Sequence, residues 1–296
     1  MKFDRTFIAI RKRNQLEILD LSLHVIRDHW KPLLALWLIG FLPFAMFNGF
    51  ILFELGSDSY DQEHLWLYCL LMAVLINSQS QVATVFMTVY LGKAMFAEQT
   101  MIWDTVQSIL KTNRYFIWTH GGLRLLIPIM FFAFLIKGLV GFDSLLMLTV
   151  LICLLALIGI LIRYGRPFAN EILTLEKTPV FSKDKRKITY AKRSRILHSD
   201  ASADITGRAL NVALYSVPLF GCAMGTLITI DSALSLHSNS EVLPLVTYFP
   251  IALWMVVGFC AVVRYLSYID IRIRQEGWEV ELRVRAEAQR LEQMVR

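Results

Sequence analysis

VTYFPIALWMVVGFCAVVRY, residues 246–265, is an almost wholly apolar segment whose one charged residue, Arg264, stands next to its end. An α-helix rising 1.5 Å per residue needs about 20 such residues to cross the hydrocarbon core of a bilayer. Five further segments have the same character. The predicted membrane spans are residues 33–55, 65–91, 123–140, 145–162, 209–230 and 246–265.

The segments between these spans alternate between many and few basic residues. Residues 1–32 carry seven Lys and Arg and residues 163–208 carry eleven, whereas residues 56–64 and 231–245 carry none. Because Lys and Arg are retained on the cytoplasmic side of a membrane, both termini and residues 163–208 are expected in the cytoplasm. The same distribution accounts for the net charge of +6, so that charge is no indication of a nucleic-acid partner.

This pattern predicts an all-α, polytopic integral membrane protein of three parts. Residues 1–32 form a cytoplasmic amphipathic segment, residues 33–266 a six-helix membrane domain, and residues 267–296 a cytoplasmic charged helix. In the last helix opposite charges recur at i,i+4, which supports a solvated helix by about 0.2–0.5 kcal/mol per pair. Three amphipathic helices are expected along the membrane surface, over residues 15–30, 101–118 and 167–175.

A stripe of polar side chains runs along the second predicted span. Its members, at i, i+4, i+7 and i+11 on one helix face, are Asn77, Gln81, Thr84 and Thr88. Amides and hydroxyls within a bilayer need hydrogen-bond partners, so the stripe is expected to face the interior of the bundle. Two interpretations stay open: hydrogen bonding between helices, or the wall of a path for a polar substrate.

Gly221 and Gly225 form a GxxxG pattern in the fifth predicted span. Small residues at this spacing let a second helix approach closely. That helix is expected either within the same chain or in a second copy of it, which leaves the oligomeric state open. The four cysteines all fall within apolar runs without CxxC spacing, and we interpret them as small apolar residues.

Two surfaces are candidates for contacts outside the membrane domain. A basic stretch close to the expected inner membrane surface would attract anionic lipid headgroups, at about 1 kcal/mol per residue, or simply enforce the topology. Three apolar side chains on the last helix either dock a protein partner or belong to a solvated helix. The lipid-contact residues are Lys183, Lys185, Arg186, Lys187, Lys192, Arg193 and Arg195, and the docking residues are Trp278, Leu282 and Leu291.

No sequence pattern for a reaction is found. The chain lacks a GxSxG nucleophile, an HExxH zinc pair and a GxxxxGK phosphate loop, and its six histidines have no metal-ligand spacing. Glu171 and Glu176 lie near Arg166, where pairing of arginine with carboxylate that pins a surface helix is favoured over acid–base catalysis. We therefore predict that the protein is not an enzyme and has no cofactor.

Three segments carry a resemblance to a known family: TVYLGKAMF (88–96), GRPF (165–168) with EIL (171–173) and LE (175–176), and RYLSYIDIRIRQEGWE (264–279). In them the chain resembles an uncharacterised family of bacterial polytopic membrane proteins. More distantly it is similar to the membrane domain attached to some glycerophosphodiester phosphodiesterases, whose soluble catalytic barrel is absent here. The resemblance implies a bacterial cytoplasmic membrane and an all-helical domain, and it implies no reaction.

Two functional hypotheses follow. In the first, the protein is a non-enzymatic scaffold or assembly partner that acts through its cytoplasmic helices. The alternative is a transporter or permease component for a neutral or lipid-like substrate, because no ionisable residue lies near the centre of any span to couple transport to ions. Membrane lipids and a protein at the C-terminal helix are the expected partners.

Overall fold

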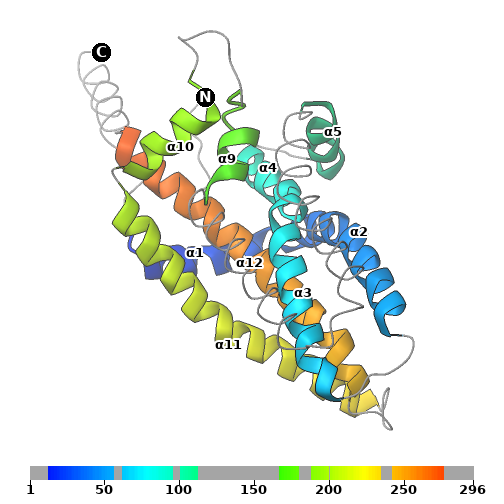
Figure 1. Ribbon diagram of the computed structural model, residues 1–296. Coiled ribbons are helices and arrows are strands. Elements are labelled where there is room, and N and C mark those ends of the chain that lie inside the picture. The colour runs from blue at the N-terminus through cyan, green and yellow to red at the C-terminus, as the bar shows by residue number, and fades with distance from the viewer. Residues whose placement is uncertain are drawn as a thin grey trace, which may run out of the picture.

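The computed structural model describes residues 13–56, 62–95, 101–112, 167–179, 188–199, 201–234 and 242–276. These residues form helices and their connections, with no strand among them (Figure 1). The all-helical prediction is confirmed for these parts of the chain. The helices are α1 (Gln15–Asp28), α2 (Trp30–Gly56), α3 (Gln62–Ala83), α4 (Val85–Ala94), α5 (Ile102–Thr112), α9 (Ala169–Thr174), α10 (Tyr190–Ser199), α11 (Ser202–Leu234) and α12 (Val242–Glu276).

Four stretches of these helices are long and apolar enough to cross a membrane. They coincide with the first, second, fifth and sixth predicted spans, whereas the third and fourth, residues 123–140 and 145–162, lie outside the described residues. Such lengths and compositions are those of a membrane-embedded protein. The four stretches are Trp30–Gly49, Tyr68–Ala94, Ser202–Leu234 and Val246–Gln275.

The outer surface of the bundle is strongly apolar. On α11 the side chains of Leu210, Leu214 and Val217 are 71%, 68% and 71% exposed, and on α2 that of Met46 is 75% exposed. A continuous apolar surface of this kind is rare on a monomeric protein in water. It is the surface expected where lipid chains cover the helices.

The helices pack mainly around α12. α11 lies beside α12 along the bundle, α3 packs against α12, and α2 packs against α3 and α4 (Figure 1). With 33 and 35 residues, α11 and α12 are each about 50 Å long, which exceeds the ~30 Å hydrocarbon core. At one end of the bundle the C-terminal ends of α4 and α12 meet the N-terminal end of α11. We call this end of the bundle the charged end. α1, α9 and α10 pack around it.

The surface helices partly follow the prediction. The chain turns at His29, between α1 and α2. α1 buries Ile18, Ser22 and Val25 against the protein and leaves other apolar side chains exposed. The second expected helix, residues 101–118, is observed as α5 within the described residues. The third is the shorter α9, which begins after Pro167. Its residues Ala169–Leu173 are all buried, so the prediction of an amphipathic surface helix is wrong for α9.

The largest group of buried apolar side chains lies at the charged end and includes residues of α1, α4, α9, α10 and α12. Tyr268, Asp270, Ile271 and Ile273 of α12 are between 0% and 2% exposed. The prediction of a solvated helix is therefore wrong for this part of residues 267–296. The helix continues the sixth span as expected, but its first turns beyond that span are covered by α1, α9 and α10.

One very close contact holds α2 against α3. The helix changes direction at Thr84, between α3 and α4, and the carbonyl group of Ala83 just before it faces Gly40 of α2. A Cβ atom at position 40 would lie 2.9 Å from the carbonyl carbon of Ala83 and closer still to its oxygen. Real Cβ atoms are essentially never found so near a backbone, so only glycine fits at this position.

Candidate functional site

The described residues of the three segments that carry the family resemblance meet at the charged end, where Tyr265 donates its hydroxyl to the carbonyl of Leu91 at 3.2 Å. Arg264 of α12 donates a hydrogen bond from Nε to Oε1 of Glu171 on α9, at 2.9 Å, and from Nη2 to Oγ1 of Thr84, at 3.3 Å. The Glu171 side chain is fully buried and that of Arg264 is 13% exposed. Asn170, next to Glu171, donates to the backbone carbonyl of Gln81 at 2.6 Å. These bonds fix α9 to α3 and to α12.

A second ion pair fixes α10. The guanidinium of Arg193 binds the Glu176 carboxylate with both Nε and Nη2, at 2.6 and 2.9 Å. Tyr268 donates its hydroxyl to the same carboxylate at 2.6 Å, and Arg272 lies 3.7 Å from it. Burial raises the pKa of Glu176, but the hydrogen bonds from Arg193 and Tyr268 and the charges of Arg193 and Arg272 outweigh burial and lower the pKa below its ordinary 4.5.

The lowered pKa of Glu176 predicts an acid-sensitive contact. Since the folded pKa lies below the unfolded one, these bonds contribute stability that is fully present above pH 4.5 and is lost as the pH falls through the folded value. Between pH 7 and about pH 3.5 we expect the melting temperature of the wild type to fall more than that of Glu176→Gln. Asp20→Asn, which alters an exposed carboxylate, is the control. Its melting temperature should fall as much as that of the wild type. An equal fall in all three proteins would contradict the assignment.

A third group of ion pairs joins α11, α12 and the chain before α1. Arg208 of α11 binds Asp270 of α12 at 2.5 Å and Asp204 at 2.8 Å. Arg274 also reaches Asp270, at 3.0 Å, which confirms the predicted i,i+4 pair. The backbone N–H of Arg13 donates to Asp270 at 2.9 Å, and Arg274 donates to the carbonyl of Arg13 at 2.6 Å. Both ends of the described chain therefore meet here.

Together these ion pairs form what we call the charged cluster. Its members are the arginines Arg193, Arg208, Arg264, Arg272 and Arg274 and the carboxylates Glu171, Glu176, Asp204 and Asp270. Among these described residues the cluster has one guanidinium more than it has carboxylates. The predicted pairing of Glu171 and Glu176 with arginine is observed, with Arg264 and Arg193 as the partners.

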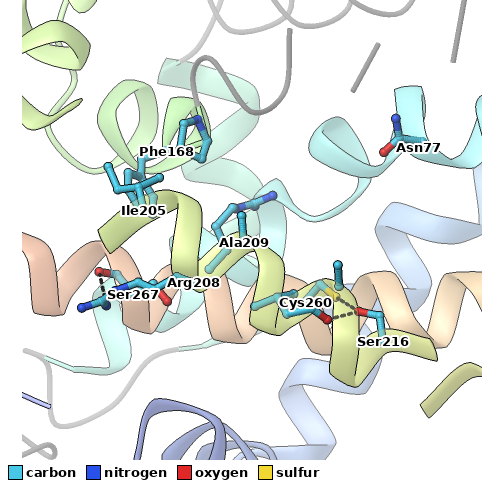
Figure 2. Close-up of a pocket in the computed structure, with 12 residues that line it drawn as sticks. Asn77, Phe168, Ile205, Arg208, Ala209, Ser216, Cys260 and Ser267 are labelled. Atoms are coloured by element: carbon cyan, nitrogen blue, oxygen red, sulfur yellow. Dashed lines mark hydrogen bonds between the residues drawn. The ribbon is translucent and has the colours of Figure 1, made fainter. Parts of the chain in front are cut away.

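A cavity of about 290 Å³ lies beside this cluster, between α11 and α12, and Figure 2 shows it. Arg208 and Arg264 line it, and Ser216, Cys260 and Ser267 add polar atoms. The rest of the wall is largely apolar and includes Phe168, Ile205, Ala209, Val212 and Ala213. The cavity thus combines two arginines with an apolar surface, as sites for amphiphilic molecules do.

The predicted polar stripe lies mostly inside the bundle. Gln81, Thr84 and Thr88 are 6%, 2% and 0% exposed, while the less buried Asn77 lines the cavity. Thr84 donates its hydroxyl to the carbonyl of Ser80 at 2.7 Å, and Thr88 donates to that of Thr84 at 3.2 Å. Both hydroxyls are therefore engaged by the backbone of their own helix.

A pair of amides that the stripe does not contain joins α2 to α3. Asn48 and Gln79 are 3% and 0% exposed and exchange two hydrogen bonds, at 2.9 and 2.7 Å. The two amides were a signal in the sequence, because each lies within a predicted membrane span. Sequence reasoning missed the pair because Asn48 and Gln79 lie in different predicted spans, and the spacing within one span cannot show a contact between two.

The remaining predicted site residues are placed as follows. On α11 both Gly221 and Gly225 are exposed, and no atom of the described residues lies within 4 Å of a Cβ built there. On α10 the lipid-contact candidates Lys192 and Arg195 are exposed, but Arg193 is turned inward to Glu176. The basic residues 183–187 and the docking candidates Trp278, Leu282 and Leu291 lie outside the described residues.

Two buried oxygen atoms at the site have no hydrogen-bond partner among the described residues: Oδ1 of Asn170 and Oε2 of Glu171. In the same residues no group of three or more His, Cys, Asp or Glu side chains could hold a metal ion. The arrangement is suited to binding and to holding helices together, since its charged groups are paired with one another.

Comparison of the chain with protein-family models, with curated proteins and with solved structures finds no match. The described residues form a helical protein with four helices long and apolar enough to cross a membrane, and buried ion pairs join these helices at one end.

Proposed function

We propose that this protein is a non-enzymatic scaffold of the bacterial cytoplasmic membrane that holds a partner protein at its cytoplasmic face. In this proposal the chain crosses the membrane six times and the charged end lies in the cytoplasm. The topology is supported by the basic residues, which gather in the segments that flank the charged end, whereas residues 56–64 and 231–245 at the opposite end carry none.

The charged cluster is the observation that carries this proposal. Its ion pairs tie α9, α10, α11 and α12 to one another, and Asp270 also binds the backbone before α1. Removing one partner of a buried pair is costly, so the five segments are held in one arrangement. We call this fixed arrangement of five segments the platform. It suits a protein that holds other proteins in position, whereas a transporter must open and close a gate.

α12 connects this platform to the C-terminal residues of the chain. It runs without interruption from the apolar core of the bundle to Glu276, so residues 277–296 begin from a fixed point on the platform. The side chains proposed to dock a partner, Trp278, Leu282 and Leu291, follow directly in the sequence.

Affinity purification from native membranes tests the scaffold. We expect a chain lacking residues 279–296, and a Trp278→Ser/Leu282→Ser/Leu291→Ser variant, to lose a protein that co-purifies with the wild type. Both variants should keep the wild-type melting temperature, because the charged cluster lies outside the altered residues. Undiminished recovery of every co-purifying protein with both variants would contradict the docking role.

A second candidate, a permease component for a neutral or lipid-like substrate, is favoured by the contact of the stripe residue Asn77 with the cavity. In proteoliposomes that move a short-chain fluorescent phospholipid, Gln81→Leu is then expected to reduce the rate about tenfold or more. Thr226→Leu, which alters an exposed hydroxyl of α11, is the matched control. Equal rates for both variants would exclude the stripe as a path.

A further inference from the structure

We infer that the cavity between α11 and α12 binds an anionic amphiphile, a molecule with a phosphate or carboxylate head and an acyl chain. This inference does not depend on the scaffold function. It depends on the cavity, on the two arginines in its wall and on the lipid-facing surface beside it.

The head of the ligand is assigned to Arg264. Arg208 lies beside it in the wall, and its three guanidinium nitrogens already bind Asp204, Asp270 and the carbonyl of Ser267. Arg208 and Arg264 both line the cavity, with side chains 6% and 13% exposed, and each is already positioned by carboxylates on its protein side. A guanidinium has five N–H donors in a fixed plane, so it can bind a carboxylate on one side and an anion on the other. In Arg264 the bonds to Glu171 and Thr84 use Nε and Nη2, and neither uses Nη1.

The two guanidinium groups in the cavity wall favour an anion over a cationic head, because like charges repel, and a charged acceptor binds them more strongly than a neutral one does. Ser267 and Ser216 supply further polar atoms in the wall.

The rest of the cavity fits an acyl chain. Ile205, Ala209, Val212 and Ser216 recur at helical spacing on the face of α11 that lines the cavity. A volume of about 290 Å³ lies at the lower limit of typical ligand pockets, so it holds the head and the first part of a chain. The remaining carbons would lie along the exposed apolar face of α11 at Leu210 and Leu214.

Photo-crosslinking to the purified full chain tests the site. The probes are phosphatidylglycerol and phosphatidylcholine that carry a photoreactive group on one acyl chain, each used in vesicles of phosphatidylcholine. Ala213→Trp fills the cavity from an exposed part of its wall, and Leu234→Trp places the same side chain at the other end of α11, at a position 64% exposed. An excess of inorganic phosphate is added in a third arm.

We expect phosphatidylglycerol to label the cavity-lining peptides at least about fivefold more than phosphatidylcholine, a difference of about 1 kcal/mol. Ala213→Trp should abolish that preference, and Leu234→Trp should keep it. Equal labelling by both lipids, or a preference unchanged in Ala213→Trp, would overturn the assignment. Displacement of the labelled lipid by inorganic phosphate would also overturn it, because the cavity would then recognise a free anion without a chain.

Discussion

Arg264→Met is expected to lower the free energy of unfolding by about 3–5 kcal/mol. The substitution leaves Glu171, whose side chain is fully buried, without the guanidinium that binds it at 2.9 Å. It also removes the hydrogen bond to Thr84, so α12 loses its bonds to α9 and to the junction of α3 and α4. Unfolding in mixed detergent, followed by tryptophan fluorescence, measures the loss.

The control is Arg27→Met, which breaks an ion pair with Asp28 whose two side chains are 73% and 41% exposed. That variant should change stability by no more than about 0.5 kcal/mol. The double variant Glu171→Met/Arg264→Met removes both charges, and we expect it to be more stable than Arg264→Met alone. A cost for Arg264→Met as small as that of Arg27→Met, or a double variant no better than the single one, would contradict a buried, coupled pair.

Gly40→Ala is expected to destabilise the bundle by about 3 kcal/mol, at the upper end of the cost of overpacking. The added Cβ would meet the carbonyl group of Ala83, and a backbone atom cannot move aside as a flexible side chain can. To admit the methyl group, α2 must move away from α3, which weakens the neighbouring Asn48–Gln79 amide pair. The melting temperature and the yield of monodisperse protein measure the effect.

Gly49→Ala is the matched control, because Gly49 lies in the same helix and no atom of the described residues is within 4 Å of a Cβ built there. Alanine has the higher helix propensity, so this variant should be as stable as the wild type or slightly more stable. Equal melting temperatures for the two variants would show that the helices do not approach as closely as the structure indicates.

The four long apolar helices could be predicted from the sequence, because apolar length alone distinguishes them from other helices. Which charges pair between different helices could not be predicted. Glu171 lies near Arg166 in the sequence, but its partner in the structure is Arg264, 93 residues further on. Which arginine reaches a given carboxylate depends on how α9 packs against α12, and spacing along the chain carries no information about that packing.

The sequence contains a pattern that indicates burial of α12 beyond the sixth predicted span, but the charged residues in the same stretch suggested the opposite. Tyr265, Ile269 and Ile273 recur every fourth residue and are all buried. Helical periodicity of this kind predicts a face packed against protein. The intervening arginines and Asp270 suggested solvent instead, because i,i+4 pairs are most often found on exposed helices.

The contact of Arg13 and Arg208 with Asp270 sets an order for the biogenesis of the protein. A ribosome delivers Arg13 and Glu171 long before it delivers α12, so their partners do not yet exist when the first helices form. The charged end can therefore close only after α12 has been synthesised. A chain that stops short of α12 lacks the arginine that pairs with Glu171 and the aspartate, Asp270, that binds Arg208.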